Sequence, residues 1–120
     1  MLTSASMLTP DISQVASATL WPEDNPDDFQ KDLEAKIKEV DTGDGVIILA
    51  DMLGGTPGNR AVFSIGEKAR LLAGMSLPML LSLLYTRDET NDIEALSRTA
   101  LEDAADNLVD VNELMKMGDA

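Results

Sequence analysis

The run "VIILA" at residues 46–50 restricts the possible folds most, because five apolar residues follow one another without alternation. A strand with one face in water alternates between apolar and polar residues, whereas a short continuous aliphatic run is typical of a strand buried on both faces. Asp51 ends the run. The stretch "MLGGTPGN" that follows predicts a tight turn and a helix that Thr56 caps and Pro57 begins. The pattern therefore predicts an inner strand of a parallel sheet.

Several other stretches carry the signals of helices. Asn25 is an expected N-cap, and the sequence "DTGDG" at residues 41–45 ends the helix that it begins. The apolar residues of this helix recur at helical spacing: Phe29, Leu33, Ile37 and Val40. Ser76 is expected to cap the apolar helix "LPMLLSLLY", and a last helix begins near Ile93. Residues 1–10 also look like a helical piece, which a proline stops.

Short apolar stretches between these helices supply the remaining strands. "QVASATL" at residues 14–20 and "ARLLAG" at residues 69–74 are candidate strands, and "LVDVNELM" at residues 108–115 predicts either a short strand or a helical tail. Strands that alternate with helices are typical of βαβ units. We therefore expect an α/β fold with a doubly wound, mostly parallel sheet and helices on both faces, as a single domain over residues 1–120.

The charge of the chain limits the classes of partner that it can bind. With a net charge of −13 the chain would be repelled by DNA, RNA and anionic membranes, whereas a basic protein partner fits, as does a role in solubility alone. The N-terminus lacks the basic residues of a signal peptide, and the longest apolar stretch is too short to span a bilayer. We expect a cytoplasmic protein. The absence of cysteine excludes disulfides and thiolate nucleophiles, and no acidic group is placed to suggest a metal site.

The glycine turn after Asp51 is the candidate binding feature. Ligands of such sheets bind beyond the carboxyl ends of the strands, and the free N–H groups at a helix start favour an anion. The turn at residues 74–76 is similar and should share this rim. A carboxylate at this place would repel a bound phosphate, unless the carboxylate accepted a hydrogen bond from another group, such as the N–H of an imidazole. An alternative stays open, in which Gly54 and Gly55 only make a tight turn and Asp51 is merely solvated.

Two stretches, "GDGVIILADMLGGTPGNRA" and "LLAGMSLPMLLSLL", resemble the third and fourth strands, with their following turns, of the enzyme IIA domain of the mannose-family sugar phosphotransferase system. The resemblance implies a doubly wound α/β domain, usually a homodimer that exchanges a C-terminal strand. It also implies a phosphocarrier without cofactor or metal. Such a domain accepts a phosphoryl group from the protein HPr on a histidine and passes it to a IIB component, which phosphorylates a sugar that crosses the membrane through IIC and IID.

The resemblance also implies roles for individual residues. Asp51 would hold the imidazole ring, and Gly54, Gly55 and Thr56 would surround the phosphohistidine. Three residues would form the partner-facing rim: Leu53, Met75 and Ser76.

One departure from the family lies at the N-terminus. Members of the family begin with an apolar strand and a turn such as Ser-His-Gly, whereas residues 1–10 here look like the helix that follows that turn. We therefore expect an N-terminally truncated domain that lacks the first strand and the phosphoacceptor histidine, and that is inactive alone. Two alternatives are a histidine-less, non-enzymatic module that binds HPr or IIB, and the phosphotransfer subunit of a dihydroxyacetone kinase.

Overall fold

The computed structural model describes residues 13–18, 23–52 and 69–118. Along the chain these residues form four helices and two strands: α2 (Pro26–Val40), β1 (Val46–Ala50), β2 (Ala69–Ala73), α4 (Leu77–Thr86), α5 (Ile93–Asp106) and α6 (Val111–Gly118). The strands pair in parallel, with Val46 opposite Ala69 and Ala50 opposite Ala73. Both strands were predicted, and the parallel pairing confirms the expected α/β class.

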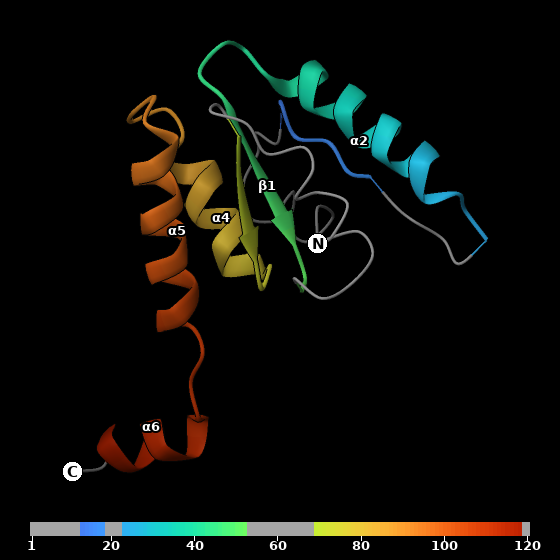
Figure 1. The fold of residues 1–120 in the computed structure, drawn as a ribbon. Coiled ribbons are helices and arrows are strands. Elements are labelled where there is room, and N and C mark those ends of the chain that lie inside the picture. Colours follow the sequence, from blue (N-terminus) through green and yellow to red (C-terminus); the bar gives the residue numbers. More distant parts are fainter. Residues whose placement is uncertain (1–12, 19–22, 53–68, 119–120) are drawn as a thin grey trace.

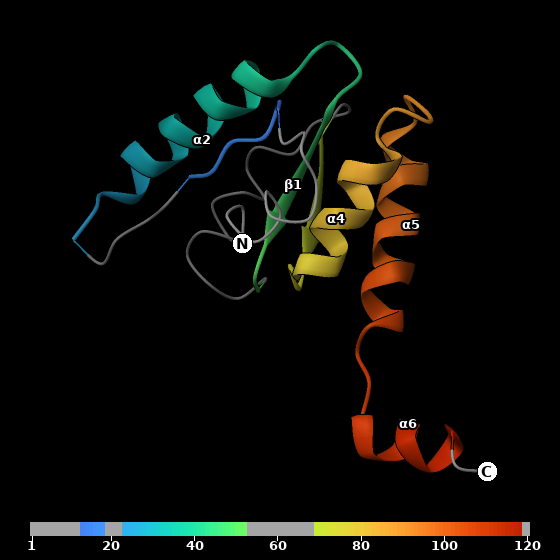
Figure 2. The ribbon, with the colours of Figure 1, turned by 180° about the vertical axis from the view of Figure 1, so that it is seen from behind.

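Helices cover both faces of this sheet, as Figures 1 and 2 show, with α2 on one side and α4 and α5 on the other. On the α2 side, Ile48 and Leu71 pack against the buried residues Phe29 and Leu33. On the other side, Leu72 forms a cluster with residues of α4 and α5. Because neighbouring residues of a strand point to opposite faces, each face needs its own apolar set. This explains why the run at residues 46–50 does not alternate.

Side-chain caps fix where the helices begin. The carboxamide oxygen of Asn25 accepts the N–H of Asp27 at 2.8 Å, and the hydroxyl of Ser76 accepts the N–H of Met79 at 3.3 Å. Both caps were predicted from the sequence. Each satisfies a backbone donor that has no partner within its own helix, and such a cap stabilises a helix by about 1 kcal/mol.

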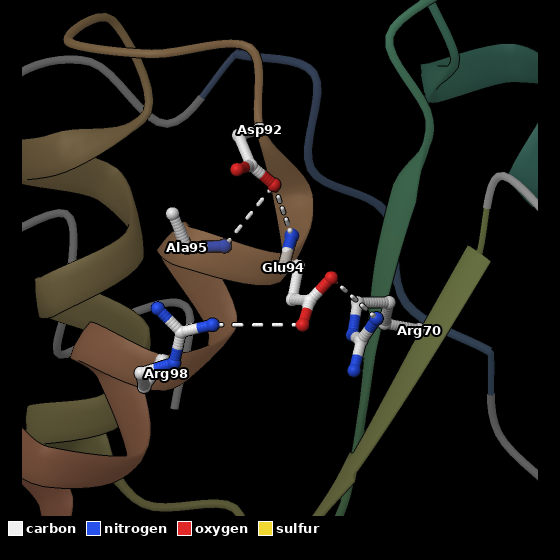
Figure 3. Close-up of polar contacts among 5 residues, drawn as sticks. All are labelled: Arg70, Asp92, Glu94, Ala95 and Arg98. Atoms are coloured by element: carbon white, nitrogen blue, oxygen red, sulfur yellow. Dashed lines mark hydrogen bonds and ion pairs between the residues drawn. The ribbon is translucent and has the colours of Figure 1, made fainter.

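A third cap and two ion pairs secure the start of α5 beside β2 (Figure 3). The carboxylate of Asp92 accepts the N–H groups of Glu94 at 3.0 Å and Ala95 at 3.2 Å. The Glu94 carboxylate lies 3.5 Å from the guanidinium of Arg98 and 4.0 Å from that of Arg70 on β2. These charged groups are largely exposed, so the pairs add little stability. The Arg98 pair lies within α5, whereas the Arg70 pair joins α5 to the strand that its apolar side covers.

The strand expected at residues 14–20 is wrong over its described part. Residues 13 and 14 form a turn, residues 15–18 have no regular structure, and Gln14 has a φ of 58°. A left-handed residue breaks an extended strand. Within the described ranges, residues 15–18 have no ladder partner. Val15 and Ala18 still pack against the apolar clusters of the two helix layers. Residues 19 and 20, and the helix expected at residues 1–10, lie outside the described residues.

The C-terminal segment forms a helix and not a strand. The carboxylate of Asp110 accepts the N–H groups of Asn112 and Glu113, so it caps α6. Every residue of α6 is exposed, and the helix extends away from the end of α5 (Figure 1). Of the two structures that the sequence allowed here, the helical tail is the one that forms.

Candidate functional site

Asp51 lies at the carboxyl end of β1, where its side chain is exposed. One carboxylate oxygen accepts the N–H of the next residue, Met52, at 2.8 Å. This contact holds the carboxylate close to its own backbone at the end of the sheet. A carboxylate offers about four acceptor positions, so the described contact leaves capacity for another donor.

The turn after β2 is joined to the end of β1 by two backbone hydrogen bonds. The N–H of Gly74 donates to the carbonyl of Asp51 at 3.2 Å, and the N–H of Met75 donates to the carbonyl of Ala50 at 2.9 Å. Gly74 has a φ of 83°, which lies in the left-handed region that favours glycine. The structure therefore brings Asp51, Met75 and Ser76 together at one rim. Met75 and Ser76 are half-buried there.

Four of the predicted site residues lie outside the described residues. These are the residues expected around a phosphoryl group and one residue of the expected rim: Gly54, Gly55, Thr56 and Leu53. The described part of the rim consists of an exposed carboxylate, a thioether and the capped start of α4. The Ser76 hydroxyl already accepts a backbone N–H, and the whole sequence contains neither histidine nor cysteine. With its carboxylate, this arrangement can accept a hydrogen bond from a donor group of a partner and so orient that group.

Neither a metal cluster nor a membrane span is found in the part of the chain that the structure describes. No group of three histidine, cysteine, aspartate or glutamate side chains there is placed to hold a metal ion. None of the helices at residues 23–52 and 69–118 is long and apolar enough to cross a bilayer.

The sequence analysis missed a trough of about 960 Å³ beside β1. We define the trough by the described residues that line it, which come from residues 14–18, from α2 and the loop after it, from residues 46–51, from α4 and from residues 87–96. Asp51 and Met75 lie at one end, so the trough leads to the rim. The only signal in the sequence was the aliphatic run itself, which predicts burial but does not identify the neighbours that cover it.

Comparison with known proteins gives one consistent family. Residues 1–101 match the family described as "PTS system fructose IIA component". The chain is 30% identical over 104 residues to the "PTS system mannose-specific EIIAB component" of Escherichia coli, which covers 85% of this chain and 32% of that protein. It is 31% identical over 88 residues to the "PTS system fructose-specific EIIA component" of Bacillus subtilis, which covers 67% of this chain and 60% of that protein. The chain thus spans about a third of the first relative's length.

Two solved structures show the same fold. A phosphotransferase system component EIIA from Streptococcus agalactiae aligns with a TM-score of 0.82 and 20% identity, over 93% of this chain and 87% of that one. A PTS IIA protein associated with the fucose utilization operon of Streptococcus pneumoniae aligns with a TM-score of 0.79 and 24% identity, over 95% of this chain and 85% of that one. At these identities the likeness concerns the fold alone. It confirms the expected fold class.

The left-handed turn at the rim gives a stability prediction. Gly74→Ala should lower the free energy of unfolding by about 1–2 kcal/mol, because an added Cβ disfavours a positive φ. The surroundings leave room for the methyl group, so the cost comes from the backbone. Urea denaturation measures this difference. Gly118→Ala is the matched control, since the added Cβ meets nothing there and the residue ends a helix. Equal stabilities of the two variants would show that the turn does not require glycine.

Proposed function

Because this chain belongs to the fructose/mannose-type enzyme IIA family of the sugar phosphotransferase system, we propose that it is the cytoplasmic phosphocarrier component of such a system. In this role it receives a phosphoryl group from HPr and passes the group to a IIB component. The observation that carries the proposal is the exposed carboxylate of Asp51 at the carboxyl end of a parallel strand, within the residues that match the family.

The proposed role of Asp51 is to orient an imidazole. Its carboxylate accepts the N–H of Met52 and has acceptor capacity left for the N–H of a ring. A carboxylate bound to one ring nitrogen fixes the tautomer, so the other nitrogen presents its lone pair to phosphorus. We assign the backbone N–H groups around Gly54, Gly55 and Thr56 to the phosphoryl oxygens. Leu53, Met75 and Ser76 would then face HPr and IIB.

The imidazole itself must come from outside these 120 residues, because they contain no histidine. In this proposal the chain binds its phosphotransfer partners but does not hold a phosphoryl group by itself. The alternative function, a histidine-less module that binds HPr or IIB, would use the same surface. It differs only in that no imidazole would bind to Asp51.

Partner binding is tested with two exposed apolar residues. We expect the chain to bind HPr, and Met52→Glu, next to Asp51, to weaken this binding at least tenfold, about 1.4 kcal/mol. Calorimetric titration measures the affinity. Leu101→Glu adds the same charge at an exposed apolar residue of α5 and should leave the affinity unchanged. With phosphoenolpyruvate, enzyme I and HPr, the chain should gain no acid-labile phosphate. Absence of HPr binding at low salt would overturn the proposed function, and label on the chain would overturn the need for an external imidazole.

We further propose that α6 joins two copies of the chain. Six apolar residues of the segment at residues 108–118 are more than half exposed: Leu108, Val109, Val111, Leu114, Met115 and Met117. An isolated helix of eight residues is marginal in water, so packing against a neighbour would stabilise it. A homodimer, which the family resemblance implies, provides such a neighbour.

The dimer is tested by placing one charge on either side of α6. Leu114→Glu should shift the chain to a monomer in sedimentation equilibrium at moderate salt, because it buries a carboxylate in an apolar contact. Asn112→Glu introduces the same charge on the polar side and should leave the dimer intact. A monomer for the unchanged chain, or an equal effect of the two variants, would contradict the assignment.

A further inference from the structure

Residues 13–18 form a wall of the trough that joins the two helix layers, and we call this segment the strap. Figures 1 and 2 show the strap on the side of β1 that faces α2. Val15 packs against a buried cluster of α4, and Ala18 packs against a buried cluster of α2. Residues 14–18 line the trough together with residues 46–51, whereas none of the described residues of β2 lines it. The strap therefore lies beside β1, away from β2.

The first residue of the strap is bound to the end of α4. The guanidinium of Arg87, which directly follows α4, donates a hydrogen bond to the carbonyl of Ser13 at 2.6 Å. The two residues are 74 positions apart in the sequence. A charged donor makes a shorter and stronger hydrogen bond than a neutral one. We call this hydrogen bond the latch, because it joins the start of the strap to the helix layer of α4.

The second residue of the strap has a backbone conformation that opposes this arrangement. Gln14 has a φ of 58°, and it is the one described residue other than glycine with a positive φ. A residue with a Cβ disfavours the left-handed region, so it keeps such a conformation where its surroundings hold it. Gln14 is exposed and lies between the latch at Ser13 and the packed side chain of Val15. Contacts on both sides therefore hold a strained residue in place.

The strap lies beside the segment of the described chain that is best suited to pair with another chain. Residues 46–50 are all aliphatic or small, and they contain neither a charge nor a proline. Uncharged segments of this kind pair edge to edge and aggregate when they become accessible. One edge of β1 is already paired with β2. A strand of a second copy would therefore have to approach β1 from the side on which the strap lies.

We propose that the strap is a strained cover of β1, which keeps residues 46–50 from pairing with a second copy of the chain and opens when the latch breaks. Opening relieves the left-handed conformation of Gln14, so the strain favours opening and the latch opposes it. The net charge of −13 is a separate barrier to association, and salt screens it. The strap acts within the fold of the chain and is independent of phosphotransfer.

Opening of the strap is measured with a thiol at position 15, because the chain contains no cysteine. Val15→Cys places a small apolar side chain at a half-buried position. Arg87→Gln, added to this variant, should raise the rate of labelling by a maleimide about tenfold, because it removes the charged donor of the latch. Gln14→Gly should lower the rate about threefold, because it removes the strain. Arg98→Gln, at an exposed arginine of α5, should leave the rate unchanged.

Gly74→Ala distinguishes opening of the strap from unfolding of the whole chain. This substitution lowers the stability of the fold at the rim and leaves the latch intact, so it should not change the labelling of Val15→Cys. An equal increase with Gly74→Ala and Arg87→Gln would overturn local opening. An unchanged rate with Arg87→Gln would overturn the latch, and an unchanged or higher rate with Gln14→Gly would overturn the role of strain.

The covering of β1 is tested by association at moderate salt, where the charge of the chain is screened. In light scattering, the chain with Arg87→Gln should grow beyond a dimer about tenfold faster than the chain with Arg98→Gln, which has the same net charge. Amides of residues 46–50 should exchange hydrogen more slowly in the associated material than in the dispersed chain, since pairing adds backbone hydrogen bonds. Equal growth of the two variants, or associated material without this protection, would overturn the proposed cover.

Discussion

The parallel pairing of β1 with β2 is the interaction on which the rest of the structure depends. The five residues of β1, all aliphatic or small, lie opposite five residues of β2, of which all but Arg70 are aliphatic or small. Both faces of the pair must be removed from water. The buried side of α2 covers one face, and α4 with α5 covers the other. The trough beside β1 lies between these helices, because residues of α2 and of α4 line it. The trough is thus a consequence of the same burial that stabilises the sheet.

The same pairing determines the geometry of the rim. The two strands end at the same level, so the backbone hydrogen bonds from Gly74 and Met75 reach the last residues of β1. These bonds place Asp51 beside the start of α4, at the end of the trough. The rim therefore holds a carboxylate that can accept a hydrogen bond from an N–H group, although the chain contains no histidine. This is why we interpret the site as one half of a phosphohistidine site.

Local signals in the sequence predicted most of the fold. The caps at Asn25 and Ser76 depend on residues within three positions, so a single sequence contains the information for them. The aliphatic run predicted β1 because burial on both faces leaves a clear pattern. The strand expected at residues 14–20 was wrong over residues 15–18 because a strand needs a partner, and moderate β-propensity does not supply one. Residues 108–115 were ambiguous because a short apolar stretch without a buried face fits either structure.

The site was predictable only in part, because some of its features depend on segments that lie far apart in the sequence. Asp51 and the turn at residues 74–76 follow strands, so their common rim could be inferred from topology. The trough depends on the spacing of α2, α4 and residues 14–18 in space, which no local pattern encodes. The central claim is that Asp51 is the hydrogen-bond partner of an imidazole. The most direct test is the pKa of free imidazole, followed by NMR with and without the chain. A carboxylate partner favours the charged ring, so binding should raise this pKa, and Asp51→Asn should remove the increase. An unchanged pKa in the saturated complex would contradict the claim.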